Sequence, residues 1–112
     1  MAKTLQTIRR AKFVIQQGQC HYCGCSMWEG RPSVQQARIG KFAQQMRCTA
    51  EHLRARSDGG GNAYDNIVAA CHWCNRLRHA RPVPLSADAF KVLVRKRVQK
   101  GKWHPVRLET LA

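Results

Sequence analysis

The chain has 112 residues, which is enough for one compact domain and too few for two ordinary ones. It carries 20 Lys and Arg residues against six Asp and Glu residues, and the resulting formal charge of +14 predicts a polyanionic partner. With 44% hydrophobic and 23% charged residues, and no apolar run of about 18 residues, neither a disordered tail nor a membrane-spanning helix is expected.

The first half of the chain predicts two helices and a strand. Apolar residues at helical spacing predict a helix over residues 5–17 that ends at Gly18, and the CHYCGC segment that follows has the composition of a tight turn. A weaker helical pattern, interrupted by Gly40, covers residues 33–46. Residues 47–53 alternate enough to predict a short strand.

The second half predicts a loop, a strand and two helices. The Gly-, Asn- and Asp-rich residues 55–66 predict a loop, and residues 67–70 suit a second strand that would form a hairpin with the first. A helix is expected over residues 72–79, before two prolines. Ser86 is a good N-cap for a last helix of residues 87–99, and the tail that follows reads as extended.

Nothing in the composition divides the chain, so a single domain over residues 1–112 is expected. It would comprise a basic N-terminal helix (1–19), a core (20–80) and a basic C-terminal helix and tail (81–112). The charge is concentrated in the two flanks, because residues 51–80 carry a net charge of only +1. This distribution predicts phosphate-binding segments on either side of a central site. The flanking residues that we expect to contact nucleic acid are Arg9, Arg10, Lys12, Arg95 and Lys96.

Four of the six cysteines form two pairs with metal-ligand spacing. The pairs are Cys20 with Cys23 and Cys71 with Cys74. Two intervening residues let both sulfurs of a pair bind one ion, so the two pairs predict a closed, structural Zn²⁺ site. The start of the chain lacks the pattern of a signal peptide, so a cytoplasmic protein is expected, in which thiols stay reduced. Cys25 and Cys48 are interpreted as free thiols, with Cys25 in place of Cys23 as the alternative ligand.

The residues between and after the cysteine pairs occur in an order with a known counterpart. They are Glu51-His52, Gly59-Gly60, Asn66-Ile67 and Cys71-His72-Trp73-Cys74-Asn75. This order resembles the HNH endonucleases, in the zinc-bound subset built on two cysteine pairs, and the resemblance covers about residues 8–79. It implies an α+β fold, with a small ββα-metal (His-Me finger) domain on the four-cysteine zinc site. It also implies a metal-dependent endonuclease that nicks or cuts DNA.

The resemblance also implies roles for individual residues. His52 would be the general base, since an imidazole with a pKa near 6.5 accepts a proton at neutral pH. Glu51 and Asn75 would hold one divalent cation, Mg²⁺ or Mn²⁺, although Asp and His are commoner at these two positions. Asn66 would either hold the loop or orient the His52 ring. The implied products carry 5′-phosphate and 3′-hydroxyl ends.

Basic residues surround this motif, and we interpret them as contacts to the DNA phosphate backbone beside the scissile bond. They are Arg54, Arg56, Arg76 and Arg78. Two other classes of function remain open: a non-catalytic zinc module that binds nucleic acid, and an RNA-directed nuclease or a toxin aimed at DNA. Small proteins of this kind resemble phage and bacterial enzymes that work beside packaging, restriction or mobile-element machinery. The sequence leaves the partner protein and the choice between monomer and homodimer open.

Overall fold

A two-stranded antiparallel hairpin lies in the middle of the molecule. The structure is a computed structural model that describes residues 4–106 and 108. Strand β1 (Cys48–His52) pairs with β2 (Ile67–Cys71), and the register runs from Cys48 opposite Cys71 to His52 opposite Ile67. The hairpin therefore has one end at the second cysteine pair and the other at His52.

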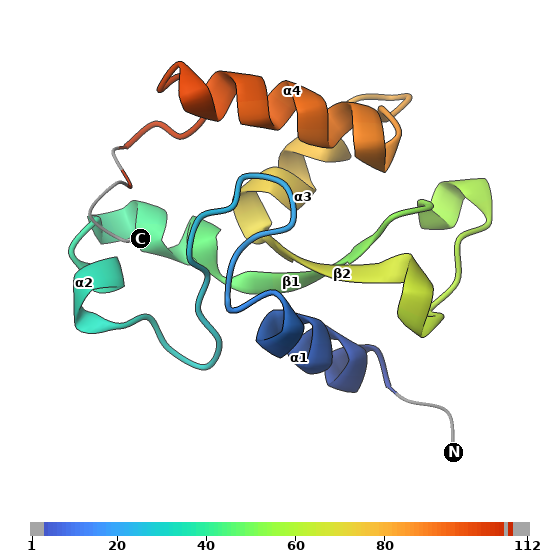
Figure 1. The fold of residues 1–112 in the computed structure, drawn as a ribbon, viewed down its shortest axis with the longest axis horizontal. Coiled ribbons are helices and arrows are strands. Elements are labelled where there is room, and N and C mark those ends of the chain that lie inside the picture. The colour runs from blue at the N-terminus through green and yellow to red at the C-terminus, as the bar shows by residue number, and fades with distance from the viewer. Residues whose placement is uncertain (1–3, 107, 109–112) are drawn as a thin grey trace.

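Helices cover both sides of the hairpin. Figure 1 shows α1 (Leu5–Ile15) below the strands, with α3 (His72–Arg78) and then α4 (Ala87–Gln99) above them. Because β2 lies between these layers, all five of its residues are buried. This placement explains why β2 reads in the sequence as an apolar run and not as an alternating pattern. The hairpin and the helix that follows it confirm the predicted α+β fold with its ββα unit.

Helix α1 is held against the hairpin by one amide side chain. The helix begins at Leu5, where the Thr4 hydroxyl accepts a hydrogen bond from the backbone N–H of Thr7. It ends two residues earlier than predicted. Gln16, just after it, pairs with the backbone of Ala69 in β2. Its amide nitrogen donates to the Ala69 carbonyl over 2.8 Å, and its oxygen accepts from the Ala69 N–H over 2.9 Å. Gln16 thus satisfies backbone groups on the open edge of β2.

Helix α4 has the predicted bounds and is capped by the Ser86 hydroxyl, which accepts from the Ala89 N–H. Its buried face includes Phe90, whose ring meets that of Tyr22 edge-to-face at 4.9 Å between centroids. This contact packs α4 against the loop that carries the first cysteine pair. The helix covers that loop, as well as α3.

The helical stretch predicted over residues 33–46 is interrupted at Gly40, as the sequence predicts. The segment forms a short helix, α2 (Val34–Ala37), followed by the 3₁₀ helix η1 (Gly40–Met46). Gly40 adopts a φ of +72°, which an α-helix does not permit, so the helical pattern is broken there. Two more 3₁₀ turns, η2 (Arg56–Asp58) and η3 (Tyr64–Asn66), lie in the hairpin loop. The end of the predicted extended tail lies outside the described residues. No helix within residues 4–106 has the length and hydropathy needed to cross a membrane.

Candidate active site and zinc centre

Four cysteine thiols meet in the buried core beside one end of the hairpin. Sγ atoms of Cys20, Cys23, Cys71 and Cys74 all lie within 4.8 Å of one another. The first pair comes from the loop after α1, and the second spans the junction of β2 and α3. The spacing of the sulfurs fits a tetrahedral ion, since Cys23 Sγ and Cys71 Sγ are 3.9 Å apart. The edge of a tetrahedron with Zn–S arms of about 2.3 Å is about 3.8 Å.

Hydrogen bonds stabilise negative charge on these sulfurs. The backbone N–H of Cys71 donates to Cys20 Sγ over 3.3 Å, and the indole N–H of Trp103 donates to Cys74 Sγ over 3.3 Å. Burial raises the pKa of the Cys20 thiol, but hydrogen bonds from the other three thiols outweigh it and hold that pKa well below its usual value. The hydrogen bond with Cys20 raises the pKa of Cys23 in turn, and burial raises that of Cys74. By their spacing the four cysteines could hold zinc, as predicted.

Cys48 lies outside this cluster, in β1. It is buried, and burial raises the pKa of its thiol to about 12, so the thiol is neutral at pH 7. Cys25 is half-buried and follows the first pair. The structure thus confirms that the second member of the first pair, Cys23, completes the four-cysteine cluster.

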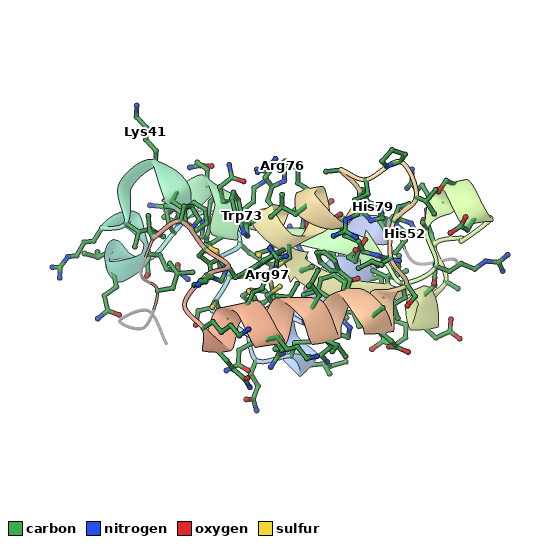
Figure 2. All side chains as sticks on the ribbon, turned by 90° about the horizontal axis from the view of Figure 1, so that it is seen from above. Lys41, His52, Trp73, Arg76, His79 and Arg97 are labelled. Carbon is green, nitrogen blue, oxygen red and sulfur yellow. The ribbon has the colours of Figure 1, made fainter. Side chains whose placement is uncertain are left out.

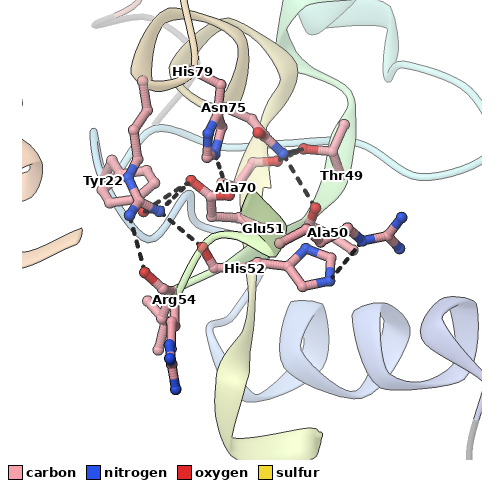
Figure 3. A network of polar contacts seen from close by, with 12 residues as sticks. Tyr22, Thr49, Ala50, Glu51, His52, Arg54, Ala70, Asn75 and His79 are labelled. Atoms are coloured by element: carbon pink, nitrogen blue, oxygen red, sulfur yellow. Dashed lines mark hydrogen bonds and ion pairs between the residues drawn. The ribbon is translucent and has the colours of Figure 1, made fainter. Parts of the chain in front are cut away.

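At the far end of β1, the Glu51 carboxylate is buried in a polar network (Figure 3). The residue is 1% exposed. Its Oε2 accepts from the Tyr22 hydroxyl over 2.9 Å and from Arg78 Nη1 over 3.1 Å, and its Oε1 lies 3.0 Å from His79 Nε2. Burial, and then the adjacent Glu51 carboxylate, raise the pKa of Tyr22 far above its usual value, so the hydroxyl stays protonated and donates. Glu51 thus links β1 both to α3 and to the loop that carries Cys20 and Cys23, which we call the zinc loop.

Arg78 is buried at the end of α3 and is only 3% exposed. Besides Glu51, its guanidinium donates to the backbone carbonyls of His52 over 2.8 Å, of Leu53 over 3.0 Å and of Leu85 over 3.1 Å. The predicted contact of Arg78 with phosphate does not fit this placement, because the guanidinium faces inward and its donors are taken. Arg78 is instead the buried cation that neutralises Glu51.

His52 ends β1 beside the hairpin loop and is 9% exposed. Its Nε2 lies 2.8 Å from Asn62 Oδ1 and 3.3 Å from the Arg56 Nε–H. The first contact needs a proton on Nε2 and the second needs a lone pair there, so one neutral tautomer satisfies only one of them. With the proton on Nε2, Asn62 accepts it, and Nδ1 then carries the lone pair. Asn62 was not among the residues predicted for the site.

Asn66 holds the hairpin loop closed. Its Oδ1 accepts from the backbone N–H of Arg54 over 2.8 Å, and its Nδ2 donates to the carbonyls of Arg54 over 3.2 Å and of Gly61 over 2.8 Å. Of the two roles predicted for Asn66, these contacts match loop holding. The hydrogen bond that can orient the His52 ring comes instead from Asn62.

Helix α3 brings two more polar side chains to the hairpin. Asn75 donates through Nδ2 to Thr49 Oγ1 over 3.0 Å and to the Ala50 carbonyl over 3.2 Å. Residue 79 lies four positions after residue 75, so His79 comes from the same side of the helix and reaches Glu51. His52 and His79 lie in the same part of the molecule (Figure 2). The ββα unit therefore places the acid of β1 beside the histidine that follows α3, and it bonds the Asn75 amide to the strand residues just before that acid.

The sequence model of the HNH endonuclease family matches residues 20–81, a segment that contains both cysteine pairs, the hairpin and α3. The chain belongs to the HNH endonuclease family. As a member of this family it is a phosphodiester hydrolase, and its substrate is a nucleic acid. Neither the comparison with curated proteins nor that with solved structures gives a match.

Most of the other predicted nucleic-acid contacts of this HNH domain lie at its surface. Arg54, Arg56 and Arg76 are exposed around the site, and Arg76 lies over the Trp73 ring at 5.2 Å from its centroid. Outside the motif, the exposed members are Arg10, Arg95 and Lys96.

Three predicted contacts in the flanks have partners within the protein. Arg9 pairs with Glu29 over 3.2 Å, and Lys12 Nζ lies over the Tyr64 ring at 4.0 Å from its centroid. The guanidinium of Arg95 donates to the carbonyls of Tyr22 and His21. Arg95 thus ties α4 to the zinc loop of the HNH domain, although part of its surface is exposed.

Gly60 is required by a close approach in the hairpin loop. A Cβ added there would lie 1.8 Å from the Arg54 carbonyl oxygen, whereas nothing lies within 4 Å of a Cβ added at Gly61. We expect Gly60→Ala to lower the free energy of unfolding by about 1–3 kcal/mol, because the backbone must move. Gly61→Ala should change it by less than about 0.5 kcal/mol. Urea unfolding of both variants measures the difference, and equal stability of the two would contradict the loop geometry.

Proposed function

We propose that this HNH domain is a metal-dependent DNA endonuclease with His52 as its general base. The observation that carries the proposal is the contact of Glu51 in β1 with His79 after α3, with Asn75 bonded to Ala50 and with His52 next to Glu51 in the strand, beside exposed arginines. The four-cysteine cluster would hold a structural Zn²⁺ that fixes the junction of β2 and α3.

The contact between His52 and Asn62 supports the role of His52 as a base. When the Nε2–H of the neutral tautomer donates to Asn62 Oδ1, this hydrogen bond fixes the orientation of the ring. Nδ1 then has the free lone pair that accepts a proton from the attacking water. Positioned general bases of this kind contribute roughly 10²–10⁴-fold to a rate. The Arg56 side chain beside the ring would bind a phosphate oxygen.

The donor set at the site fits a hard divalent cation. Glu51 Oε1 faces His79, and Asn75 uses Nδ2 for its bonds to β1, which leaves the amide Oδ1 as a potential ligand. Carboxylate and amide oxygens suit Mg²⁺ or Mn²⁺, and the His79 imidazole is compatible with Mn²⁺. We therefore retain Glu51 and Asn75 as the proposed ligands and add His79. When bound, the cation would supply Lewis-acid stabilisation of the phosphate and the leaving oxygen.

DNA is the proposed substrate because the exposed basic residues lie around the site and on the flanking helices. Arg54, Arg56 and Arg76 would contact phosphates near the scissile bond, and Arg10 and Lys96 would extend this contact to α1 and α4. Such contacts position the duplex without reading its sequence. Low sequence specificity, with cleavage that leaves 5′-phosphate and 3′-hydroxyl ends, is therefore expected.

The experiment that tests this function offers supercoiled plasmid and structured RNA together, with Mg²⁺, Mn²⁺ or EDTA. We expect nicked or linear plasmid in either metal, no cleavage in EDTA and intact RNA. Asn75→Ala and His79→Ala should each need roughly 10-fold more Mg²⁺ for half-maximal rate, whereas His72→Ala, on the same helix, should not.

Three outcomes would contradict parts of this proposal. Degradation of the RNA with intact plasmid would make the protein an RNA-directed nuclease. Binding without cleavage in every metal would leave a nucleic-acid-binding module. Unchanged Mg²⁺ dependence in both variants would remove Asn75 and His79 from the ligand set.

A further inference from the structure

A second group of metal-binding side chains adjoins the four-cysteine cluster. Sγ of Cys23, Sγ of Cys25 and a ring nitrogen of His104 lie within 4.8 Å of one another. Cys25 comes from the zinc loop, and His104 from the segment after α4, so residues distant in sequence converge here. Thiolate sulfur and imidazole nitrogen are the ligands that Zn²⁺ prefers, at about 2.0–2.3 Å. Small movements of the side chains would bring all three atoms to that distance from one ion.

The His104 ring has an unsatisfied nitrogen. Its Nε2 is fully buried and has no hydrogen-bond partner among the described residues. The ring is held in place by an edge-to-face contact with Phe42, at 6.0 Å between centroids. A buried polar atom without a partner destabilises the folded state, and such atoms in native proteins often mark a missing ion or water. A ligand in this pocket therefore has a physical reason to bind.

The charge of the neighbouring cluster also favours a second cation. One Zn²⁺ with four thiolates carries two net negative charges in a buried place, which is costly to maintain. A second divalent cation that recruits the Cys25 thiolate would reduce this excess to one. Cys23 belongs to both groups of metal-binding side chains. A thiolate sulfur has more than one lone pair, so the Cys23 thiolate could bind both ions at once.

The second group borders open space, in contrast to the closed four-cysteine cluster. A cavity of about 600 Å³ is lined by Gly24, Cys25, His104 and Pro105, among others. Water from this cavity could occupy the fourth position of a tetrahedral ion. Two sulfurs and one imidazole select a thiophilic ion such as Zn²⁺ over Mg²⁺ or Ca²⁺, so this site is distinct in chemistry from the proposed catalytic cation site.

We propose that Cys25 and His104 bind a second Zn²⁺ ion, with the Cys23 thiolate shared between this ion and the ion of the four-cysteine cluster. The second ion ties the segment after α4 to the loop that carries the first cysteine pair. The proposal does not depend on the nuclease mechanism.

Zinc content of the purified full-length chain tests the proposal. The protein is saturated with Zn²⁺, desalted, and measured by native mass spectrometry and elemental analysis under reducing conditions. We expect two ions per chain in the wild type and one in Cys25→Ser and in His104→Ala, with circular dichroism unchanged. Cys48→Ser, which alters a buried thiol outside both groups, should retain two ions.

One ion in the saturated wild type would overturn the proposal, and so would two ions in both Cys25→Ser and His104→Ala. The proposal would also be overturned if the protein, under reducing conditions, had a mass that is lower by the two hydrogen atoms lost in a disulfide between Cys23 and Cys25. Cadmium-113 NMR of the wild type gives an answer that needs no variant. Two resonances are expected for the two sulfur-containing sites, and a single resonance contradicts them.

Discussion

Loss of the ion from the four-cysteine cluster is expected to unfold the domain and not merely to inactivate it. The ion would join the loop after α1 to the junction of β2 and α3, through side chains that are almost completely buried. A structural Zn²⁺ contributes an apparent binding free energy of about 10–16 kcal/mol, as large as the whole stability of an ordinary domain. We therefore expect Cys71→Ser to lose its zinc, its far-UV helix signal and its cooperative thermal transition.

Cys48→Ala is the matched control for this prediction. Cys48 lies directly opposite Cys71 in the hairpin and is also buried, but it belongs to neither metal-binding group. The variant should keep its zinc and unfold cooperatively. Cooperative unfolding of zinc-free Cys71→Ser, at a temperature near that of the control, would show that the core does not depend on the metal.

Arg78→Met is expected to lower the free energy of unfolding by about 3–5 kcal/mol, because it leaves the buried Glu51 carboxylate without its cation. It also removes the donors to the carbonyls of His52 and Leu53, which hold the end of β1 in place. Urea unfolding measures the loss of stability. The rate of DNA cleavage should fall as well, since His52 is attached to that backbone.

Arg9→Met is the control for this ion pair. Arg9 and Glu29 also form an ion pair, but each side chain is about one-quarter exposed, and such pairs contribute about 0–1 kcal/mol. If Arg78→Met lowers the free energy of unfolding no more than Arg9→Met does, the buried Glu51–Arg78 ion pair does not stabilise the fold as described.

The parts of the fold that the sequence predicts well are those with strong local signals. Helix α4 has both an N-cap serine and an apolar face, and its bounds agree with the prediction. The cysteine spacing predicts the four-thiol cluster without knowledge of the fold, because two intervening residues bring both sulfurs of a pair to one ion. In residues 33–46, Gly40 marks the point at which the predicted helical stretch is interrupted, and its φ of +72° accounts for the break.

The missed features depend on contacts between distant segments. The Gln16 amide pairs with Ala69 across 53 positions, and no local pattern indicates it. Asn62 meets His52 only because the hairpin loop folds back. The burial of Arg78 did leave a signal. Residue 78 lies four positions after Cys74 and three after Asn75, so it had to lie on the inward side of α3. His79 lies four positions after Asn75, so the helical spacing would also have indicated that His79 lies on the same side of the helix as Asn75.

The central claim is that His52 is the base of a nuclease, and the most direct measurement compares wild type and His52→Ala on supercoiled plasmid in Mg²⁺. His72→Ala serves as the control. The account predicts that His52→Ala cleaves roughly 10²–10⁴-fold more slowly while its zinc content and DNA affinity stay at the wild-type level, and that His72→Ala cleaves normally. Cleavage by His52→Ala at the wild-type rate would contradict the account.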